Sequence, residues 1–294
     1  MTRIAFIGLG NMGGPMAANL VKAGHAVAGF DLAPASLDAA RQAGVAVAAS
    51  AREAAAEAEV VVTMLPAGRH VVSVWSDLLD AVRPGTLLVD SSTIDVDSAR
   101  RAHALAEARG CASLDAPVSG GVGGASAGTL TFMCGGAEAA FSRAEPVLSR
   151  MGRKVVHCGG AGAGQAAKIC NNMILGISMI GVAEAFVLAE KLGLSHQALF
   201  DVASTSSGQC WSLTTYCPVP GPVPASPANN GYKPGFASSL MLKDLRLAQE
   251  AAAAAGAATP LGAAAAQLYA LHNAQGEGAT DFSGIVQMLR GEGA

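Results

Sequence analysis

The chain has 294 residues, enough for one dinucleotide-binding domain and a smaller partner domain. Hydrophobic residues make up 51% and charged residues 14% of it, so a large core can be buried. The formal net charge is −3 and no run of Lys or Arg forms a basic stripe, which argues against nucleic acid as a partner.

Short apolar runs alternate with helical patterns through the first half of the chain. The runs predict strands at residues 4–7, 26–30, 60–64, 86–89, 113–115 and 130–133. The helical patterns lie over about 15–23, 35–42, 70–79 and 97–109. Strands and helices that alternate at this spacing indicate βαβ units and a parallel sheet.

The pattern changes after the glycine cluster at residues 159–164. From 165 to about 192 the helical period holds without proline, which predicts a helix roughly 40 Å long. Its stretch 173–189 is apolar enough to suggest a membrane span, but Glu184 and Ser178 interrupt it and it is short for one, so we expect a buried helix. The remainder is helical in pattern, most clearly at 240–258 and 260–271.

The expected fold class is α/β, with a Rossmann-type NAD-binding domain at 1–163, a long interdomain helix at 164–192 and an all-helical domain at 193–294. The first strand pattern begins directly after the N-terminus, so no signal or transit peptide is expected. The six cysteines form no CxxC pair and no metal-ligand spacing. These features favour a cytoplasmic protein with reduced thiols and no metal.

A GxGxxG motif closes the first strand and opens the first helix. It consists of Gly8, Leu9, Gly10, Asn11, Met12 and Gly13. In this context the glycines allow backbone to approach a pyrophosphate at a helix N-terminus, although a plain tight turn would read the same. Asp31 ends the second strand about 20 residues later, where an acid binds the ribose hydroxyls. No arginine follows Asp31 to receive a 2′-phosphate, so NAD is favoured over NADP.

Two later strand ends should also face the cofactor, because ligands lie beyond the carboxyl ends of parallel strands. Leu65 and Pro66 follow one such strand, and Thr93 follows the next. Thr93 could hydrogen-bond the nicotinamide ribose or could simply be the N-cap of the next helix.

Polar residues on the long helix and in two neighbouring segments are candidates for chemistry. Gly164, Lys168 and Asn172 share one helix face, where the lysine needs a partner if buried but could also snorkel to water. A second glycine loop could hold a carboxylate or be a turn without function; it contains Ser119, Gly120 and Gly121. Lys243 could close over the ligands or be a surface lysine paired with Asp244.

A proline-rich stretch at 217–224 cannot be helical and could be a flexible linker. Much of the scarce aromatic content brackets it, namely Trp211, Tyr216, Tyr232 and Phe236. A long loop that carries aromatics favours the wall of a pocket.

Four segments together resemble the β-hydroxyacid dehydrogenase family, and within it the 3-hydroxyisobutyrate dehydrogenases. They are residues 6–13, 115–121, 164–172 and 242–245, in the family's order, and the resemblance spans essentially the whole chain. The stretch from Trp211 to Asn230 is the most specific, and residues 281–283 also fit.

The resemblance implies NAD-dependent oxidation of 3-hydroxyisobutyrate to methylmalonate semialdehyde, as in valine degradation. It implies Lys168 as the catalytic residue; Ser119, Gly120, Gly121, Asn172 and Trp211 as substrate-binding residues; and Leu65, Pro66, Thr93 and Lys243 beside the glycine motif at the cofactor. A small 3-hydroxy acid is the expected partner. The apolar helix further suggests a homodimer or homotetramer.

Three other functions compete with this interpretation. A relative that acts on tartronate semialdehyde, L-serine or a glyoxylate-type substrate would differ mainly in the loop at 211–232. An imine-reducing relative usually lacks a lysine at the position of Lys168. A non-catalytic nucleotide-binding module would also have lost that lysine.

Overall fold

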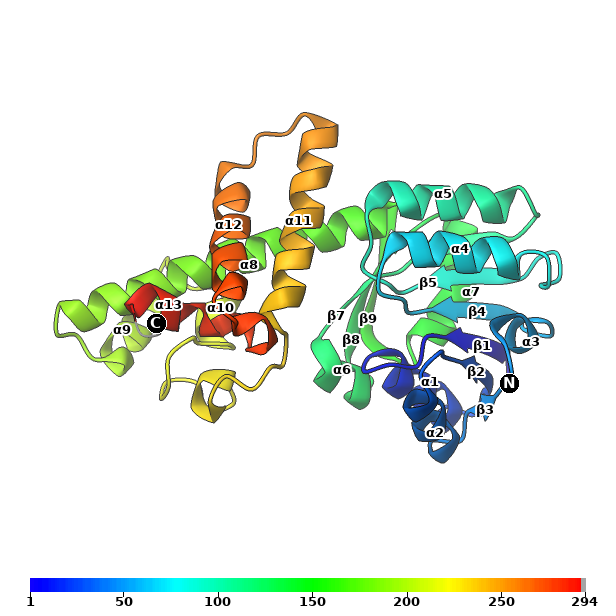
Figure 1. Cartoon of the computed structure of the whole chain (residues 1–294), viewed down its shortest axis with the longest axis horizontal. Coiled ribbons are helices and arrows are strands. Elements are labelled where there is room, and N and C mark those ends of the chain that lie inside the picture. The colour runs from blue at the N-terminus through cyan, green and yellow to red at the C-terminus, as the bar shows by residue number, and fades with distance from the viewer. Residues whose placement is uncertain (292–294) are drawn as a thin grey trace. The chain divides into compact units, whose positions relative to one another are not determined.

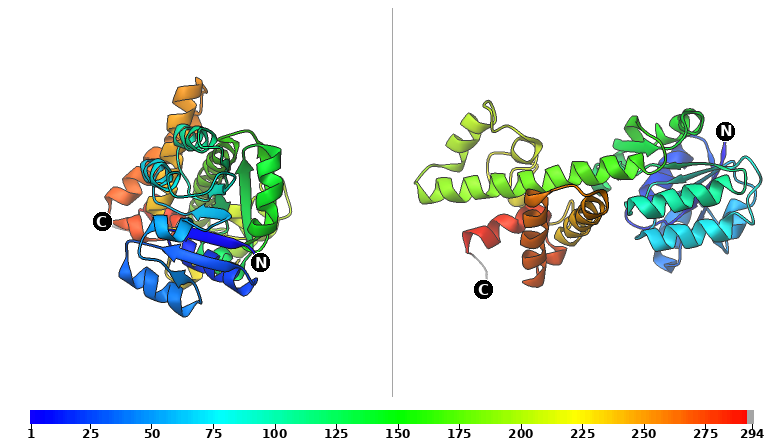
Figure 2. Two further views of the ribbon diagram at one scale, coloured as in Figure 1. Left: turned by 90° about the vertical axis from the view of Figure 1, so that its right-hand side faces the viewer. Right: turned by 90° about the horizontal axis from the view of Figure 1, so that it is seen from above.

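The computed structural model describes residues 1–291 and contains two compact units, Met1–Lys168 and Ile169–Ala294 (Figure 1). The first unit is α/β and the second is helical, as predicted for the fold class. Helix α8 (Ala163–Lys191) is a single uninterrupted helix that starts in the first unit and continues in the second (Figure 2).

The first unit is built on a nine-stranded sheet with the order β3-β2-β1-β4-β5-β6-β8-β7, in which β9 also pairs with β8. The strands are β1 (Arg3–Ile7), β2 (Ala26–Phe30), β3 (Ala46–Val47), β4 (Val60–Thr63), β5 (Leu87–Asp90), β6 (Ala112–Asp115), β7 (Val118–Ser119), β8 (Leu130–Gly135) and β9 (Gly152–Gly159). From β3 to β6 all neighbours are parallel. The parallel part therefore places the carboxyl ends of β1, β2, β4, β5 and β6 along the same side of the sheet.

The sheet is parallel from β3 to β6, as predicted, and at its other side β8 is antiparallel to both β6 and β7. The only helix between β6 and β8 is α6 (Gly121–Ala127), which is about 10 Å long. The connection from β6 to β8 also contains β7, so β8 pairs antiparallel with the strand that precedes α6 as well as with β6.

Helices cover both faces of this sheet, because alternate residues of each strand point to opposite sides. On one face Ile4 and Phe6 of β1 pack in a core with α1 (Gly13–Lys22), α2 (Pro34–Gln42), α6 and α7 (Glu138–Leu148). On the other face Ala5 and Ile7 pack with α3 (Ala51–Ala55), α4 (Gly68–Leu78) and α5 (Val96–Glu107). The two clusters lie on opposite faces of the sheet, and Figure 1 shows helices on both of these faces.

The second unit packs its helices around the later part of α8. They are α9 (His196–Ala203), α10 (Trp211–Thr214), α11 (Ser238–Ala255), α12 (Pro260–Ala274) and α13 (Ile285–Arg290), with short 3-10 turns η1 (Pro227–Asn230), η2 (Glu277–Ala279) and η3 (Phe282–Gly284). Met179 and Phe186 of α8 share a core with Leu245 of α11 and Tyr269 of α12. The helix is long and apolar enough to cross a membrane by length and composition, and 39% of its most apolar window is buried within the chain.

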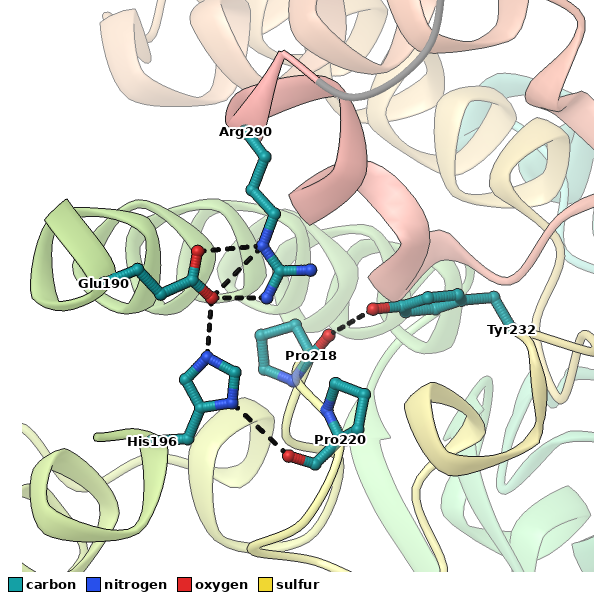
Figure 3. A network of polar contacts seen from close by, with 6 residues as sticks. All are labelled: Glu190, His196, Pro218, Pro220, Tyr232 and Arg290. Atoms are coloured by element: carbon teal, nitrogen blue, oxygen red, sulfur yellow. Dashed lines mark hydrogen bonds and ion pairs between the residues drawn. The ribbon is translucent and has the colours of Figure 1, made fainter. Parts of the chain in front are cut away.

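The proline-rich stretch at 217–224 is built into this core, which contradicts the flexible-linker alternative. Cys217 and Val219 are fully buried, and the Tyr232 hydroxyl donates to the Pro218 carbonyl at 2.9 Å (Figure 3). His196 also contacts the Pro220 carbonyl at 3.4 Å. The stretch is therefore an ordered part of the second unit.

An ion-pair cluster joins the end of α8 to the end of the chain. The Glu190 carboxylate accepts hydrogen bonds from the Arg290 guanidinium of α13 and lies 2.6 Å from His196 Nε2 (Figure 3). Burial acts to raise the pKa of Glu190, but the hydrogen bonds and charges of Arg290 and His196 outweigh it, so the pKa is lowered.

Candidate active site

The turn between β1 and α1 requires glycine at two of its three motif positions. Gly8 has φ of +95°, and a Cβ there would lie 2.2 Å from the Met64 carbonyl oxygen. A Cβ on Gly13 would lie 1.9 Å from the Gly8 carbonyl oxygen. Gly10 has nothing within 4 Å of where its Cβ would be, so open space lies beside it. The loop has the close backbone turn and the free side that a pyrophosphate needs.

The other motif residues complete this loop in different ways. Asn11 and Met12 lead directly into α1, whose N-terminus has no side-chain cap. The Leu9 side chain is buried in the core, so Leu9 contributes only its backbone to the surface of the loop. Uncapped N–H groups at a helix N-terminus favour an anionic group there.

Asp31 connects the end of β2 to the glycine loop. Its Oδ2 accepts from the Leu9 backbone N–H at 2.6 Å, and its Oδ1 accepts from the Ala33 N–H at 2.8 Å. The side chain is only partly buried, so the carboxylate keeps a solvent-facing side. A carboxylate fixed beside the loop is suited to accept from ribose hydroxyls.

The loops after β4 and β5 are joined by one buried serine. The Leu65 N–H donates to Ser92 Oγ at 2.8 Å, and that hydroxyl donates to Asp90 Oδ1 at 2.6 Å. Leu65 and Pro66 are thereby held beside the segment that carries Thr93. The alternative that Thr93 caps α5 is wrong, because the N-cap is Asp95.

Asp90 is a buried carboxylic acid at the end of β5 that sequence reasoning missed. Its Oδ1 accepts from the hydroxyls of Thr63 and Ser92, whereas its Oδ2 has no partner among the described residues. Burial raises the pKa of Asp90 to about 6, against the hydrogen bonds from Ser92 and Thr63, and the charge of Asp115 adds to the rise.

The second glycine loop lies at the junction of β7 and α6. Ser119 pairs with Thr131 of β8 in the antiparallel ladder. Gly120 and Gly121 both have positive φ, at 132° and 61°, which directs their backbone N–H groups in a way most residues cannot. The structure thus forms the loop expected there.

Lys168 and Asn172 lie one turn apart on α8, and both are buried, at 6% and 2% exposure. Such burial contradicts a lysine that snorkels to water. The Asn172 amide donates to Asp244 Oδ2 of α11 at 2.5 Å. Lys243 is therefore next to the residue that orients Asn172. Asp244 is itself only 4% exposed and is not a surface carboxylate.

The aromatic residues around the proline-rich stretch divide into two kinds. Trp211 opens α10 and is 49% exposed, with its ring stacked on Tyr216 at 4.9 Å. The Tyr216 hydroxyl donates to Asp281, and burial raises the pKa of Tyr216 with the Asp281 charge adding to the effect. Tyr232, in contrast, is a core residue.

Comparison with known proteins identifies the family. Residues 3–160 match the family model described as the NAD-binding domain of 6-phosphogluconate dehydrogenase. Residues 162–289 match the model described as NAD-binding of NADP-dependent 3-hydroxyisobutyrate dehydrogenase. A 3-hydroxyisobutyrate dehydrogenase of Pseudomonas aeruginosa is 53% identical over 99% of this chain and 100% of its own length. The chain belongs to the 3-hydroxyisobutyrate dehydrogenase family.

Two further members of this family bear on the substrate. A solved structure of Mycobacterium tuberculosis 3-hydroxyisobutyrate dehydrogenase with L-serine matches at a TM-score of 0.96, with 60% identity and 99% of both chains covered. A Pseudomonas aeruginosa protein named NAD-dependent L-serine dehydrogenase is 50% identical over 98% of both chains. The family is one of NAD-binding oxidoreductases, and the chain is an enzyme of that class.

Proposed function

We propose that this enzyme oxidises 3-hydroxyisobutyrate to methylmalonate semialdehyde with NAD. The observation that carries the proposal is a buried lysine, Lys168, one helical turn from the buried amide of Asn172, in a chain of this family. L-serine is the second candidate substrate, because a relative named for that activity is 50% identical. Both are short 3-hydroxy acids.

Lys168 is proposed as the general base for the hydroxyl proton. Bound NAD supplies the acceptor for the hydride that leaves the carbinol carbon. A general base must lie within hydrogen-bond reach of the proton that it accepts, and the proposal places the Lys168 amine beside the substrate hydroxyl. In the reverse direction the same group returns the proton to the carbonyl oxygen.

The substrate is proposed to be held at both ends. Ser119 and the N–H groups of Gly120 and Gly121 would bind its carboxylate. The Asn172 amide donates one N–H to Asp244, and its second N–H would donate to a substrate oxygen. Trp211 is proposed as a wall of the pocket.

NAD rather than NADP is the proposed cofactor, held by the glycine motif, Asp31, Leu65, Pro66, Thr93 and Lys243. The carboxylate of Asp31, fixed by Leu9 and Ala33, would repel a 2′-phosphate. One matching family model is described by an NADP-dependent member, and the relative activity with NAD and NADP distinguishes the two cofactors.

A homodimer or homotetramer in the cytoplasm is proposed, with neither nucleic acid nor membrane as partner. Most exposed large apolar side chains of the protein lie in the second unit, at Ile174, Leu188, Leu192, Leu194, Val202, Trp211, Leu240, Leu261 and Leu271. A second copy that covers part of this surface would remove it from water. A sedimentation mass near that of one 29.2 kDa chain would contradict the proposal.

The decisive experiment follows NADH or NADPH at 340 nm with 3-hydroxyisobutyrate, L-serine and glycerate, each with NAD and with NADP. Lys168→Ala should lower kcat by about 10²–10⁴-fold, the usual contribution of a general base. Lys191→Ala, an exposed lysine of the same helix, serves as the control and should leave kcat unchanged. Selective turnover of another acid would overturn the substrate, and full activity of Lys168→Ala would overturn the mechanism.

A further inference from the structure

The start of α8 is capped by a residue far away in the sequence. Gly162 precedes the helix with φ of +82° and has no side chain to accept the unpaired N–H groups of the first turn. Asp115, at the end of β6, accepts them instead. Its Oδ1 lies 2.8 Å from the Gly162 nitrogen, and its Oδ2 lies 2.8 Å from the Gln165 nitrogen. The Asp115 carboxylate therefore caps the N-terminus of α8 in place of an N-cap side chain.

His103 of α5 provides a third donor to the same carboxylate. Its Nε2 lies 2.9 Å from Asp115 Oδ1, and its Nδ1 lies 2.8 Å from the Ser113 hydroxyl. Asp115 is 1% exposed, so water does not compete for these hydrogen bonds. The carboxylate is thus fixed from the sheet, from α5 and from α8.

Two glycines leave the helix just enough room to reach Asp115. A Cβ on Gly164 would lie 2.3 Å from the Met133 carbonyl oxygen and 2.8 Å from Asp115 Oδ2. A Cβ on Gly135 would lie 2.5 Å from Asp115 Oδ1. Close contact of this kind gives the first turn of α8 one position against the strand ends.

Gln165 joins the same turn to the loop after β5. The side chain is fully buried; its Nε2 donates to the Ser92 carbonyl at 2.7 Å, and its Oε1 accepts from the Ile94 N–H at 3.1 Å. These two contacts lie on either side of Thr93. The turn that precedes Lys168 is therefore fixed to the segment proposed to hold the cofactor.

We propose that Asp115 and Gln165 are positioning residues for Lys168, an inference that rests on the proposed function of that lysine. Gln165 and Lys168 are three residues apart, so they share a helix face and move together. A displacement of about 1 Å at a reacting group can cost about 10²-fold in rate. Residues outside the proposed substrate- and cofactor-binding sets can therefore control the rate through the start of the helix.

The test uses Gln165→Met, which is close in size and lacks both hydrogen bonds, together with Asp115→Asn. In Asp115→Asn the side-chain amide replaces one of the two accepting oxygens. Its N–H group then faces the backbone N–H of Gly162 or Gln165, and that hydrogen bond is lost. Ser50→Ala is the control, because it removes the N-cap contact of α3 to Glu53 in the same unit, on a helix with no proposed site residue.

The first readout does not depend on catalysis. The rate of reductive methylation of the Lys168 amine is measured by mass spectrometry relative to exposed Lys22 in the same sample. Loss of the two Gln165 hydrogen bonds should raise the relative rate at Lys168 by about tenfold or more. The Ser50→Ala control should leave it unchanged. An unchanged relative rate in both test variants would overturn the proposal.

The second readout separates positioning from general damage. The test variants should lower kcat by about 10²-fold while the dissociation constant for NADH changes less than about threefold. The proposal would be overturned if Ser50→Ala, with the same urea unfolding midpoint as a test variant, lost as much kcat as that variant. It would also be overturned if the affinity for NADH fell by the same factor as kcat. A wild type that oxidises none of the acids would instead overturn the proposed function, and the methylation rates would still test the positioning.

Discussion

Gly164→Ala should destabilise the first unit, because the space for a methyl group is already occupied. The new Cβ would lie 2.3 Å from the Met133 carbonyl oxygen, 2.6 Å from the Asp115 carbonyl oxygen and 2.8 Å from the Asp115 carboxylate. Two of these atoms are backbone and cannot rotate away. Forcing a group into a packed site costs about 1–3 kcal/mol, and these contacts place Gly164→Ala near the upper end.

The helix itself partly offsets that cost. Alanine is favoured over glycine in a helix by about 1 kcal/mol, so the expected net loss is about 2 kcal/mol. With a urea m-value of about 2 kcal/mol/M, the unfolding midpoint should fall by about 1 M. The assay is urea unfolding followed by the fluorescence of Trp75, a residue of α4 that is 1% exposed in the core of this unit.

The matched control is Gly123→Ala in α6. Gly123 is a helical glycine of the same unit with nothing within 4 Å of where a Cβ would be. There the substitution should stabilise by about 0.5–1 kcal/mol. The change in the free energy of unfolding should therefore have opposite signs for Gly164→Ala and Gly123→Ala, because only Gly164 lacks space for a Cβ. A Gly164→Ala protein as stable as the wild type would refute the reasoning.

Three further substitutions test charges in the two units. Asp90 has a pKa raised to about 6, so its ionisation destabilises the fold progressively as pH rises from about 4 to about 6. Asp90→Asn should remove that loss, measured as the urea midpoint at pH 4 and pH 7; an equal pH dependence in both proteins would contradict it. Arg290→Ala should cost about 1 kcal/mol at pH 7. Because the pKa of Glu190 is lowered, this difference should shrink as pH falls through that pKa, which pH-dependent urea unfolding checks. Asp31→Asn should raise the NADP-to-NAD ratio of kcat/KM by about tenfold, and an unchanged ratio would remove Asp31 from cofactor selection.

The glycine turn and the acid beside it could be predicted from the sequence because their signals are local. The glycine motif is one short run, and Asp31 follows at a spacing that one βαβ unit imposes. The core strands were visible as continuous apolar runs, since a parallel sheet is covered on both faces. The order of the segments around Lys168 was equally visible through resemblance to a family.

The edge of the sheet was not accessible in the same way. β3 and β7 have two residues each, too few to show any period. Helix α7 contains Pro146, and β9 is mostly half-exposed, so neither gives a clear pattern. The antiparallel pairing of β8 with β6 and β7 has no local signal either, because the glycine-rich sequence at 121–127 does not indicate the helix α6 that precedes β8.

Two buried acids at the carboxyl edge of the sheet show why residue types alone do not define a site. Asp90 and Asp115 are direct partners in the register of β5 and β6. Neighbouring carboxylates repel each other, and the fold separates them by their donors. The Asp115 carboxylate accepts hydrogen bonds from backbone N–H groups at the start of α8 and from a ring nitrogen of His103. Asp90 accepts hydrogen bonds from hydroxyls, and one of its oxygens has no partner among the described residues. Asp115 is thereby committed to the start of the helix that carries Lys168, and its charge adds to burial in raising the pKa of Asp90. The donors come from 47 and 50 residues away along the chain, so only the fold can assign the two roles.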